Sequence, residues 1–307
     1  MTYQYVCRIC GSHHTRIVYE KAHDYITGDI FQVWQCQDCL VAATDPQPTD
    51  LSPYYPSRYR HYTPVVISIL KALYGQRVKR WANRFSEPGT AFEMGCGDGF
   101  MLDNLRKLGW KVVGNERTVA MAQFARQQLG LDVFVGDLDA LRPVPTFDLV
   151  ILFQVLEHLD DPVPVLRQIS QILTPGGKLI IGVPNFDSWQ ASWGKDRWLH
   201  LDVPRHLFHY SPASLENTLK LAGLTTEDVQ YVSLEHDPFG WLQTLYNRLD
   251  SRRNRLTRTL MALDRPTLAV IIELGLLPFL GVVCLMLSIA SWLVAKGAII
   301  QVIARKV

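Results

Sequence analysis

A glycine-rich loop is the first feature of the sequence that could bind a ligand. Gly95, Gly97 and Gly99 stand at alternate positions after the apolar run 90–94, and apolar residues recur at helical spacing beyond them. This order predicts a buried strand, a glycine loop and a helix. Glycine permits positive φ and close approach of a ligand to the main chain, and a helix start offers N–H groups to an anion. The loop fits the dinucleotide fingerprint poorly, because Phe100 occupies the place of its third glycine.

Two acidic residues follow later strands at the edge where an open α/β sheet binds its ligand. Glu116 ends the predicted strand 111–115, about twenty residues past the loop, and can accept both hydroxyls of a ribose. Enzymes that use NAD share this acid, so it does not discriminate between the two cofactors. Asp137 follows the predicted strand 132–135, where its carboxylate suits either a cofactor or the cap of a helix.

Histidines supply the candidate catalytic groups. His158 follows the predicted strand 147–153, and residues just past the carboxyl ends of such strands line the ligand crevice. Its imidazole can act as a general base near neutral pH, and it suits equally well a packing or capping role. The loop 187–209 is long for a compact domain and follows another strand, which indicates an acceptor lid. The lid contributes the further catalytic candidates His200, Arg205, His206 and His209.

Four of the six cysteines form two C-x2-C pairs near the N-terminus, Cys7 with Cys10 and Cys36 with Cys39. Each pair can present two thiolates from a tight turn, and four thiolates complete a tetrahedral zinc site. A segment this small lacks a core large enough to fold without such a cross-link. Disulfides suit a secreted chain, and a redox pair needs a βαβ context that residues 1–40 do not indicate. We therefore predict a closed, structural zinc site without a catalytic role.

Three segments resemble motifs of the class I S-adenosylmethionine (SAM)-dependent methyltransferases. The glycine loop has the form E-x-G-x-G-x-G, with Glu93 two residues before Gly95, and is similar to motif I of that family. The run 156–162, LEHLDDP, is similar to the segment that follows the family's strand four. The Pro-Gly-Gly turn 175–177 resembles its motif V. A zinc ribbon followed by such a domain also resembles the sugar C-methyltransferases of deoxysugar pathways.

The resemblance implies which residues hold the cofactor. It implies that Asp137 accepts the exocyclic amine of adenine and that the main chain of Leu138 meets the ring. The ubiquinone-type O-methyltransferases carry an acid three residues before their Glu-His pair, where this chain has Gln154, so we do not predict a catalytic divalent ion. The implied cofactor residues are Glu93, Gly95, Cys96, Gly97, Gly99, Glu116, Asp137, Leu138, Phe153, Gln154 and His158.

Composition and proline content divide the chain into three parts. Its 307 residues suit one catalytic domain with additions, and a net charge of +2 gives no reason to expect a nucleic-acid partner. Residues 1–44 are predicted to form the zinc ribbon. Residues 45–64 hold five prolines and four tyrosines, which favours an extended strap packed on the next domain. The resemblance implies that residues 65–307 form an α/β domain with a Rossmann-like seven-stranded sheet, and apolar spacing predicts a helix over 65–85 at its start.

An apolar insertion, 236–297, separates the last two predicted strands, 227–234 and 298–304. The resemblance implies that these strands pair antiparallel in one sheet. Within the insertion, 241–265 carries six arginines among leucines and is typical of an amphipathic helix on an anionic membrane surface.

The 22 positions of 274–295 hold no charge, and an all-apolar helix must be buried in lipid or protein. Both ends of the insertion belong to one sheet, so we expect a re-entrant or in-plane hairpin bent near Pro278, with a buried core helix as the alternative.

These observations predict a SAM-dependent methyltransferase for a small-molecule, sugar or lipid-linked acceptor. We expect it on the cytoplasmic side of a membrane, attached through residues 241–296 to anionic headgroups. Two alternatives remain open at this point. One is a membrane-tethered module that binds SAM without turnover, and the other is a nicotinamide-dependent oxidoreductase. Retention of S-adenosylhomocysteine or of NAD by the protein would separate the two cofactors.

Overall fold

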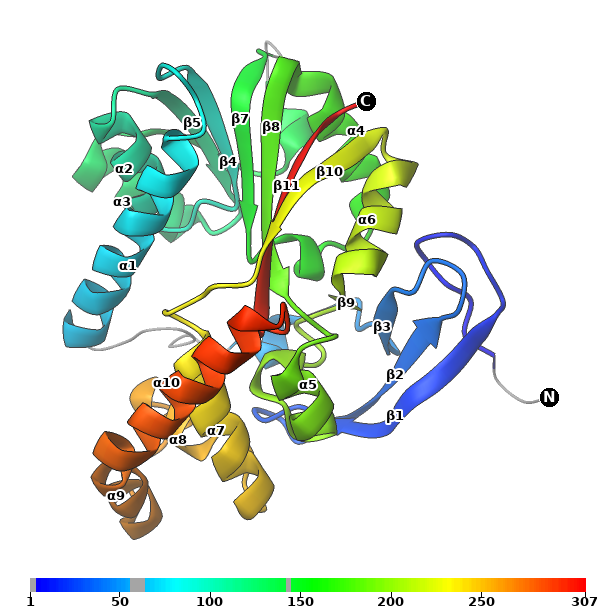
Figure 1. Ribbon diagram of the computed structural model, residues 1–307, viewed down its shortest axis with the longest axis vertical. Helices are drawn as coiled ribbons and strands as arrows, with labels where there is room; N and C mark the ends of the chain where they lie inside the picture. Colours follow the sequence, from blue (N-terminus) through cyan, green and yellow to red (C-terminus); the bar gives the residue numbers. More distant parts are fainter. Residues whose placement is uncertain (1–3, 56–63, 142–144) are drawn as a thin grey trace.

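A mostly parallel sheet of seven strands forms the centre of the protein in the computed structural model, which describes residues 4–55, 64–141 and 145–307 (Figure 1). The strand order is β10-β11-β8-β7-β4-β5-β6. β11 runs antiparallel to both neighbours, and the other neighbouring pairs are parallel. The predicted Rossmann-like fold is therefore confirmed. The strands are β4 (Thr90–Met94), β5 (Lys111–Glu116), β6 (Asp132–Val135), β7 (Phe147–Phe153), β8 (Leu173–Pro184), β10 (Leu224–Gln230) and β11 (Ile299–Lys306).

Helices cover both faces of this sheet, because its central strands are apolar on both sides. Leu149 and Ile151 of β7 pack with Trp81 on one face, while Val150 and Leu152 pack with α4 and α6 on the other. Burial of Trp81 makes α1 the leading helix of the domain, as predicted. The helices around the sheet are α1 (Pro64–Ala82), α2 (Phe100–Lys107), α3 (Val119–Leu129), α4 (Pro162–Ile172) and α6 (Pro212–Leu221).

The sixth strand of the sheet begins earlier than its sequence suggested. It was predicted over 227–234, whereas β10 runs from Leu224 to Gln230. Gly223 ends the preceding helix with a φ of +71°, so the chain enters the sheet at once, and Leu224 pairs with Lys306. The last strand pairs beside it as an antiparallel neighbour, as the resemblance implied.

The N-terminal segment forms a second, four-stranded antiparallel sheet in the order β1-β2-β3-β9. Its fourth strand comes from the predicted lid, so the ribbon and the lid are joined through one set of backbone hydrogen bonds. Thr44 strengthens the junction, since its hydroxyl donates to the carbonyl oxygen of His206 at 2.7 Å. The strands are β1 (Thr15–His23), β2 (Ile30–Cys36), β3 (Ala42–Asp45) and β9 (Phe208–His209).

The predicted strap is described up to Tyr55, and its residues 56–63 lie outside the described part of the chain. Tyr54 is buried, and its hydroxyl donates to Asp29 at 2.9 Å. The hydroxyl of Tyr55 lies 3.4 Å from Nδ1 of His158. This part of the strap thus packs against the ribbon and reaches the candidate catalytic histidine.

The basic half of the insertion is not the single helix that its composition suggested. It is broken at Asn254, whose φ is +52°, and Asn254 exchanges hydrogen bonds with Asn247 at 2.7 Å. Most of its arginines form ion pairs within the protein and not with a membrane surface. Their partners are aspartates, and the arginines are Arg252, Arg253, Arg255 and Arg258. The insertion consists of α7 (Asp237–Leu249), α8 (Arg255–Leu260), α9 (Leu268–Gly275) and α10 (Leu277–Leu293).

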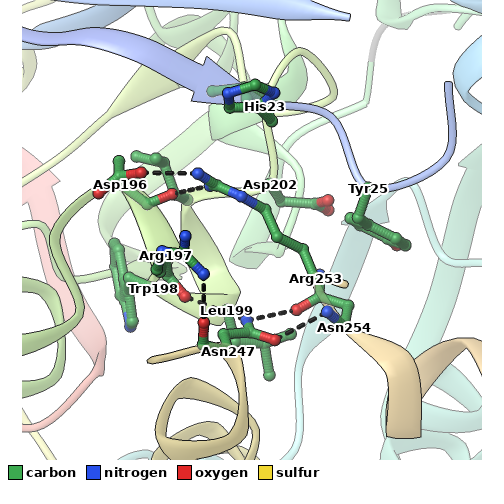
Figure 2. A pocket seen from close by; sticks show the side chains of 12 residues that line it. His23, Tyr25, Asp196, Arg197, Trp198, Leu199, Asp202, Asn247, Arg253 and Asn254 are labelled. Carbon is green, nitrogen blue, oxygen red and sulfur yellow. Dashed lines mark hydrogen bonds and ion pairs between the residues drawn. The ribbon is translucent and has the colours of Figure 1, made fainter. Parts of the chain in front are cut away.

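Figure 2 shows how the insertion is fastened to the lid beside the ribbon. Arg253 reaches Asp196 of the lid at 2.6 Å, and Arg197 of the lid donates to the carbonyl oxygen of Asn247 at 2.7 Å. His23 and Tyr25 of the ribbon line the same narrow pocket. Ribbon, lid and insertion therefore form one continuous layer beyond the end of the large sheet (Figure 1).

Within the described residues, no single helix has the length and hydropathy needed to cross a membrane. Only α9 and α10 taken together have them, and these two helices are bent by 61° at Leu276, beside Pro278. The predicted bend near Pro278 is therefore present, although at 61° the two helices do not run antiparallel as in a closed hairpin. Instead, α10 packs along α7, which buries Cys284 and Ser288 and leaves much of its apolar surface exposed.

Candidate functional site

The glycine loop follows β4 at the carboxyl edge of the parallel strands, where the sequence placed it. All three glycines have positive φ, at +68° for Gly95, +56° for Gly97 and +77° for Gly99. A Cβ at Gly95 would stand 2.8 Å from Val155, and one at Gly99 would stand 2.5 Å from Leu131. A Cβ at Gly97 would meet no atom of the described residues within 4 Å. Gly97 therefore keeps a space open against the main chain, as an approaching ligand requires.

Glu116 places its carboxylate against this loop from the end of β5. Oε2 accepts from the backbone N–H of Gly97 at 2.9 Å, and Oε1 accepts from the N–H of Thr118 at 2.8 Å. The amide of Asn115, the preceding residue, donates to the carbonyl oxygen of Gly136 at 2.7 Å. Three successive strand ends are thus connected, and the acid predicted to bind a ribose lies beside the open space at Gly97.

Glu93 is a buried acid at the end of β4. Burial raises the pKa of its carboxyl well above the ordinary value, and the charges of Asp98 and Glu116 raise it further. Its Oε2 has no hydrogen-bond partner in the part of the chain that the structure describes. Burial also raises the pKa of the neighbouring thiol of Cys96. A polar ligand that approaches the loop would give this buried oxygen a donor.

The third predicted contact point lies beyond β6. Asp137 is exposed, and its carboxylate pairs with Nε of Arg117 at 2.6 Å. Leu138 is buried at the start of a short turn. The carboxylate of Asp137, which the resemblance implies to bind adenine, therefore follows β6 at the carboxyl edge of the sheet and forms an ion pair with Arg117 in this structure.

The end of β7 carries backbone strain. Gln154 has a φ of +57°, which residues other than glycine rarely adopt, and its N–H donates to the carbonyl oxygen of Gly182 at 2.8 Å. Its side-chain Nε2 is buried with no hydrogen-bond partner among the described residues. Phe153 just before it is buried. Such strain is characteristic of ligand-binding edges, which fits the position of Gln154 at the crevice.

The structure brings His158 together with a histidine of the lid. The rings of His158 and His206 lie 4.8 Å apart between centroids and meet edge to face. Nδ1 of His158 lies 2.7 Å from the carbonyl oxygen of Arg205, and Nδ1 of His206 lies 2.9 Å from that of His200. Each carbonyl oxygen can only accept a hydrogen bond, so Nδ1 of each ring carries the hydrogen, and the neutral tautomer has its basic lone pair on Nε2.

The other two candidates described here, Arg205 and His209, make contacts that hold the lid to the ribbon. Arg205 is completely buried and pairs with Asp24 of the ribbon and with Asp202, each at 2.7 Å. Nε2 of His209 lies 3.0 Å from the hydroxyl of Thr44, and burial lowers the pKa of His209 to about 3. His209 is therefore neutral and a weak base, and both side chains connect the lid to the ribbon.

Glu157 lies beside His158 at the crevice, as its position just past β7 indicates, although sequence reasoning assigned it no role. Ligand atoms of Glu157, His158 and His206 all lie within 4.8 Å of one another. One carboxylate and two imidazoles are a donor set that divalent transition metals accept. Its adjacency to His158 in the sequence was the available signal, whereas the approach of His206 depends on the fold.

The four N-terminal cysteines converge as predicted. The sulfur atoms of Cys7 and Cys39 lie 3.5 Å apart and those of Cys10 and Cys36 lie 3.6 Å apart, and all four are free thiols within 4.8 Å of one another. Thiolates bound at about 2.3 Å to one tetrahedral zinc stand ~3.8 Å apart, so the donor set fits a closed zinc site.

The family known as the methyltransferase domain matches this chain over residues 59–229, which is more than half of its length. The chain belongs to this methyltransferase family. Membership of this family supports SAM as the cofactor of this chain, and the nicotinamide alternative loses its support. Bound SAM supplies a methyl group already activated on a sulfonium centre.

Individual relatives agree with this assignment. A ubiquinone biosynthesis O-methyltransferase of Xanthomonas euvesicatoria pv. vesicatoria is 29% identical over 175 residues, which cover 52% of this chain and 73% of that protein. A probable S-adenosylmethionine-dependent methyltransferase of Mycolicibacterium smegmatis is 34% identical over 143 residues, which cover 44% of this chain and 52% of that protein. The alignment thus spans about half the length of the second relative.

A solved SAM-dependent methyltransferase from Archaeoglobus fulgidus superposes with a TM-score of 0.50 at 17% identity, covering 77% of this chain and 94% of that one. At this identity the likeness supports the fold alone.

Proposed function

We propose that this methyltransferase works at the cytoplasmic surface of a membrane and methylates a lipid-linked or otherwise membrane-borne small molecule. The observation that carries this proposal is the apolar surface of α9 and α10. Leu268, Phe279 and Leu293 are exposed by 73%, 71% and 82%, and further large apolar residues between them are exposed as well. Contiguous apolar surface on this scale marks a contact with lipid or with another protein.

The attachment of the insertion favours a position along one leaflet. Oδ2 of Asp237, at the start of α7, accepts from the indole N–H of Trp292 at 2.5 Å and from the N–H of Ala298 at 3.1 Å. Both ends of the insertion therefore meet at one point beside the sheet. The 17 residues of α10 extend about 25 Å, which is less than the ~30 Å of a bilayer core. We place the domain on the cytoplasmic side, where SAM is available.

The histidine pair supports the chemistry that we propose. Displacement at an activated methyl asks the protein to align the acceptor and, where the acceptor carries a proton, to remove it. Nδ1 of His158 donates to the Arg205 carbonyl oxygen, so Nε2 is the nitrogen that would accept this proton. His206 packs against the His158 ring and makes its orientation depend on the lid.

We also propose that the four cysteines hold a structural zinc ion. The sulfur spacing and the closed donor set support this assignment. The ion would keep the ribbon folded and, through the pairing of β3 with β9, would keep the lid in place.

The test of the function is methyl transfer by the full chain from methyl-labelled SAM to extracted material. A membrane-lipid extract and an aqueous extract are offered separately, and Gly97→Leu serves as the inactive control. We expect label in the lipid fraction only. Label confined to water-soluble molecules would contradict a membrane-borne acceptor. Binding of S-adenosylhomocysteine without transfer to either extract would favour a SAM-binding module without turnover.

A further inference from the structure

A large apolar groove lies between α5 (Trp189–Gly194), α7 and α10. Its volume is about 670 Å³, within the range of small-molecule sites. Trp189 and Trp193 of α5 and Trp241 of α7 line it together with aliphatic side chains of α7 and α10. None of the described side chains that line it is charged. The lining thus offers an occupant large apolar surfaces and almost no polar recognition.

The groove is costly to leave in contact with water. Trp189 and Trp193 are exposed by 40% and 41%. Tryptophan has one of the largest apolar surfaces of any side chain, so this exposure leaves a large apolar area in water. Covering this surface with hydrocarbon is favourable because the hydrophobic effect scales with the apolar area removed from water. The chemistry of the groove therefore selects an apolar occupant.

The same helix forms the wall of the groove and the proposed membrane contact. Val283 and the buried Cys284 of α10 line the groove, whereas Val282 and Met286 of the same helix are exposed. One side of α10 thus faces the groove, and another side of the same helix forms the surface that we place on lipid. A hydrocarbon chain that leaves the membrane beside α10 could therefore enter the groove without crossing a polar surface.

Ring contacts lead from the crevice to the lid, and the lid touches α7, which forms one wall of the groove. The ring of His236 lies 6.0 Å from Phe153 at the end of β7 and 6.2 Å from His200 of the lid, between centroids. A Cβ at Gly240 would stand 2.8 Å from Nε2 of His200, so α7 touches the lid here. The next residue, Trp241, lines the groove. The groove therefore adjoins the acceptor side of the site.

We propose that this groove binds the hydrocarbon chain, acyl or isoprenyl, of the methyl acceptor while the reactive group lies beside His158 and His206. The choice of the acceptor as ligand rests on the function proposed above. A hydrocarbon chain fits because it is narrow, flexible and uncharged, like the lining, and because α10 connects the groove with the apolar surface of the insertion. A second copy of the chain is the competing occupant, and the experiment below detects it.

The experiment measures binding of cis-parinaric acid, a long polyene fatty acid that becomes fluorescent when it leaves water, to the full chain. Val283→Trp fills the groove, and Val282→Trp places the same side chain on the exposed surface of α10. We expect Val283→Trp to weaken binding of the probe about tenfold or more and Val282→Trp to leave it within about twofold. S-adenosylhomocysteine should bind both variants with the affinity of the wild type.

A second variant, Ser192→Trp, blocks the groove from α5 and replaces Val283→Trp if that protein fails to bind S-adenosylhomocysteine. Equal binding of the probe to wild type and blocked variants would overturn the proposal. So would a wild-type protein that binds S-adenosylhomocysteine but not the probe, or a dimer in light scattering that Val283→Trp dissociates. Failure of the wild type to bind S-adenosylhomocysteine would instead remove the proposed function.

Discussion

At the scale of single residues, the three glycines of the loop have different tasks. Gly95 and Gly99 avoid clashes with Val155 and Leu131, which are part of the protein. Gly97 alone faces a space without described atoms within 4 Å, next to the carboxylate of Glu116. Gly95 and Gly99 are therefore needed for packing within the protein, whereas Gly97 leaves room for a ligand.

We expect Gly97→Leu to abolish binding of S-adenosylhomocysteine, because the leucine would occupy the space that the ligand needs. Gly223→Leu is the matched control: Gly223 has a similar φ of +71° and equally open surroundings, but it directly precedes β10, at the edge of the sheet opposite the loop. Calorimetric titration measures both. Equal loss of affinity in the two variants would show that backbone strain, not the ligand space, decides the result.

The histidines of the site also differ in their surroundings. We expect His158→Ala to lower kcat about 10²-fold or more, the usual range for a general base, and to leave the affinity for S-adenosylhomocysteine nearly unchanged. Transfer to the lipid extract measures the first and titration the second. His14→Ala, which removes an exposed histidine of the ribbon, should change neither. Full turnover by His158→Ala would mean that the acceptor loses its proton elsewhere or carries none.

At the scale of elements, the predicted lid is a structural partner of the ribbon and also carries His206, which meets His158. β9 completes the ribbon sheet, and the buried ion pair of Arg205 with Asp24 joins the two segments. His206 stands between these two connections in the sequence. Its position beside His158 therefore depends on an intact ribbon.

We expect about one zinc ion per chain and its loss in Cys36→Ser, because three thiolates do not complete the tetrahedral site. Loss of the metal should loosen the ribbon and, through β9, reduce methyl transfer more than cofactor affinity. Metal analysis and limited proteolysis measure the outcome. Cys284→Ser changes a buried thiol outside the cluster and should keep the zinc. Wild-type protein without metal and with a protease-resistant N-terminus would contradict the assignment.

The insertion yields a prediction of its own. We expect the double change Phe279→Asp and Met286→Asp to reduce flotation with phospholipid vesicles strongly, because each carboxylate would have to enter an apolar layer. Val119→Asp with Phe124→Asp, at exposed apolar positions of α3, is the matched control and should leave flotation unchanged. Equal flotation of both proteins would exclude α10 as the membrane contact.

At the scale of the whole molecule, Asp237 holds the insertion to the sheet. Burial raises the pKa of its carboxyl to about 7, although hydrogen bonds from Trp292 and Ala298 oppose the shift. The folded protein thus binds this proton more tightly than the unfolded chain. The stabilisation is complete below the ordinary pKa of 3.8 and is lost as the pH rises through 7.

We therefore expect the free energy of unfolding of the wild type to decrease between about pH 4 and pH 7 by up to ~1.4 kcal/mol per pH unit from this group. Asp237→Asn cannot ionise and should flatten the dependence. Denaturant titrations at several pH values measure it, with Asp139→Asn at an exposed position as the control. Parallel curves for wild type and Asp237→Asn would show that the raised pKa does not affect folding.

Local pattern in the sequence was sufficient for the glycine loop and the cysteine cluster, and the resemblance to the methyltransferase family added the fold class. The strands 132–135 and 147–153 were predicted with their observed bounds, because their apolar runs and flanking turn residues are neighbours in the chain. The two C-x2-C pairs carry their geometry in their own spacing. The same reasoning misjudged 241–265, since a composition of arginine and leucine does not reveal the break at Asn254.

The tertiary structure decided which distant groups meet. Arg205 finds Asp24 across 181 positions, and Thr44 contacts His209 across 165. The approach of His206 to His158 and the use of the basic half's arginines in ion pairs are likewise properties of the packed chain. Periodicity reports only which side of an element is apolar. The charged or aromatic group that an element meets on its partner depends on how all the elements pack together. This packing involves residues far apart in the chain, so a local pattern does not reveal it.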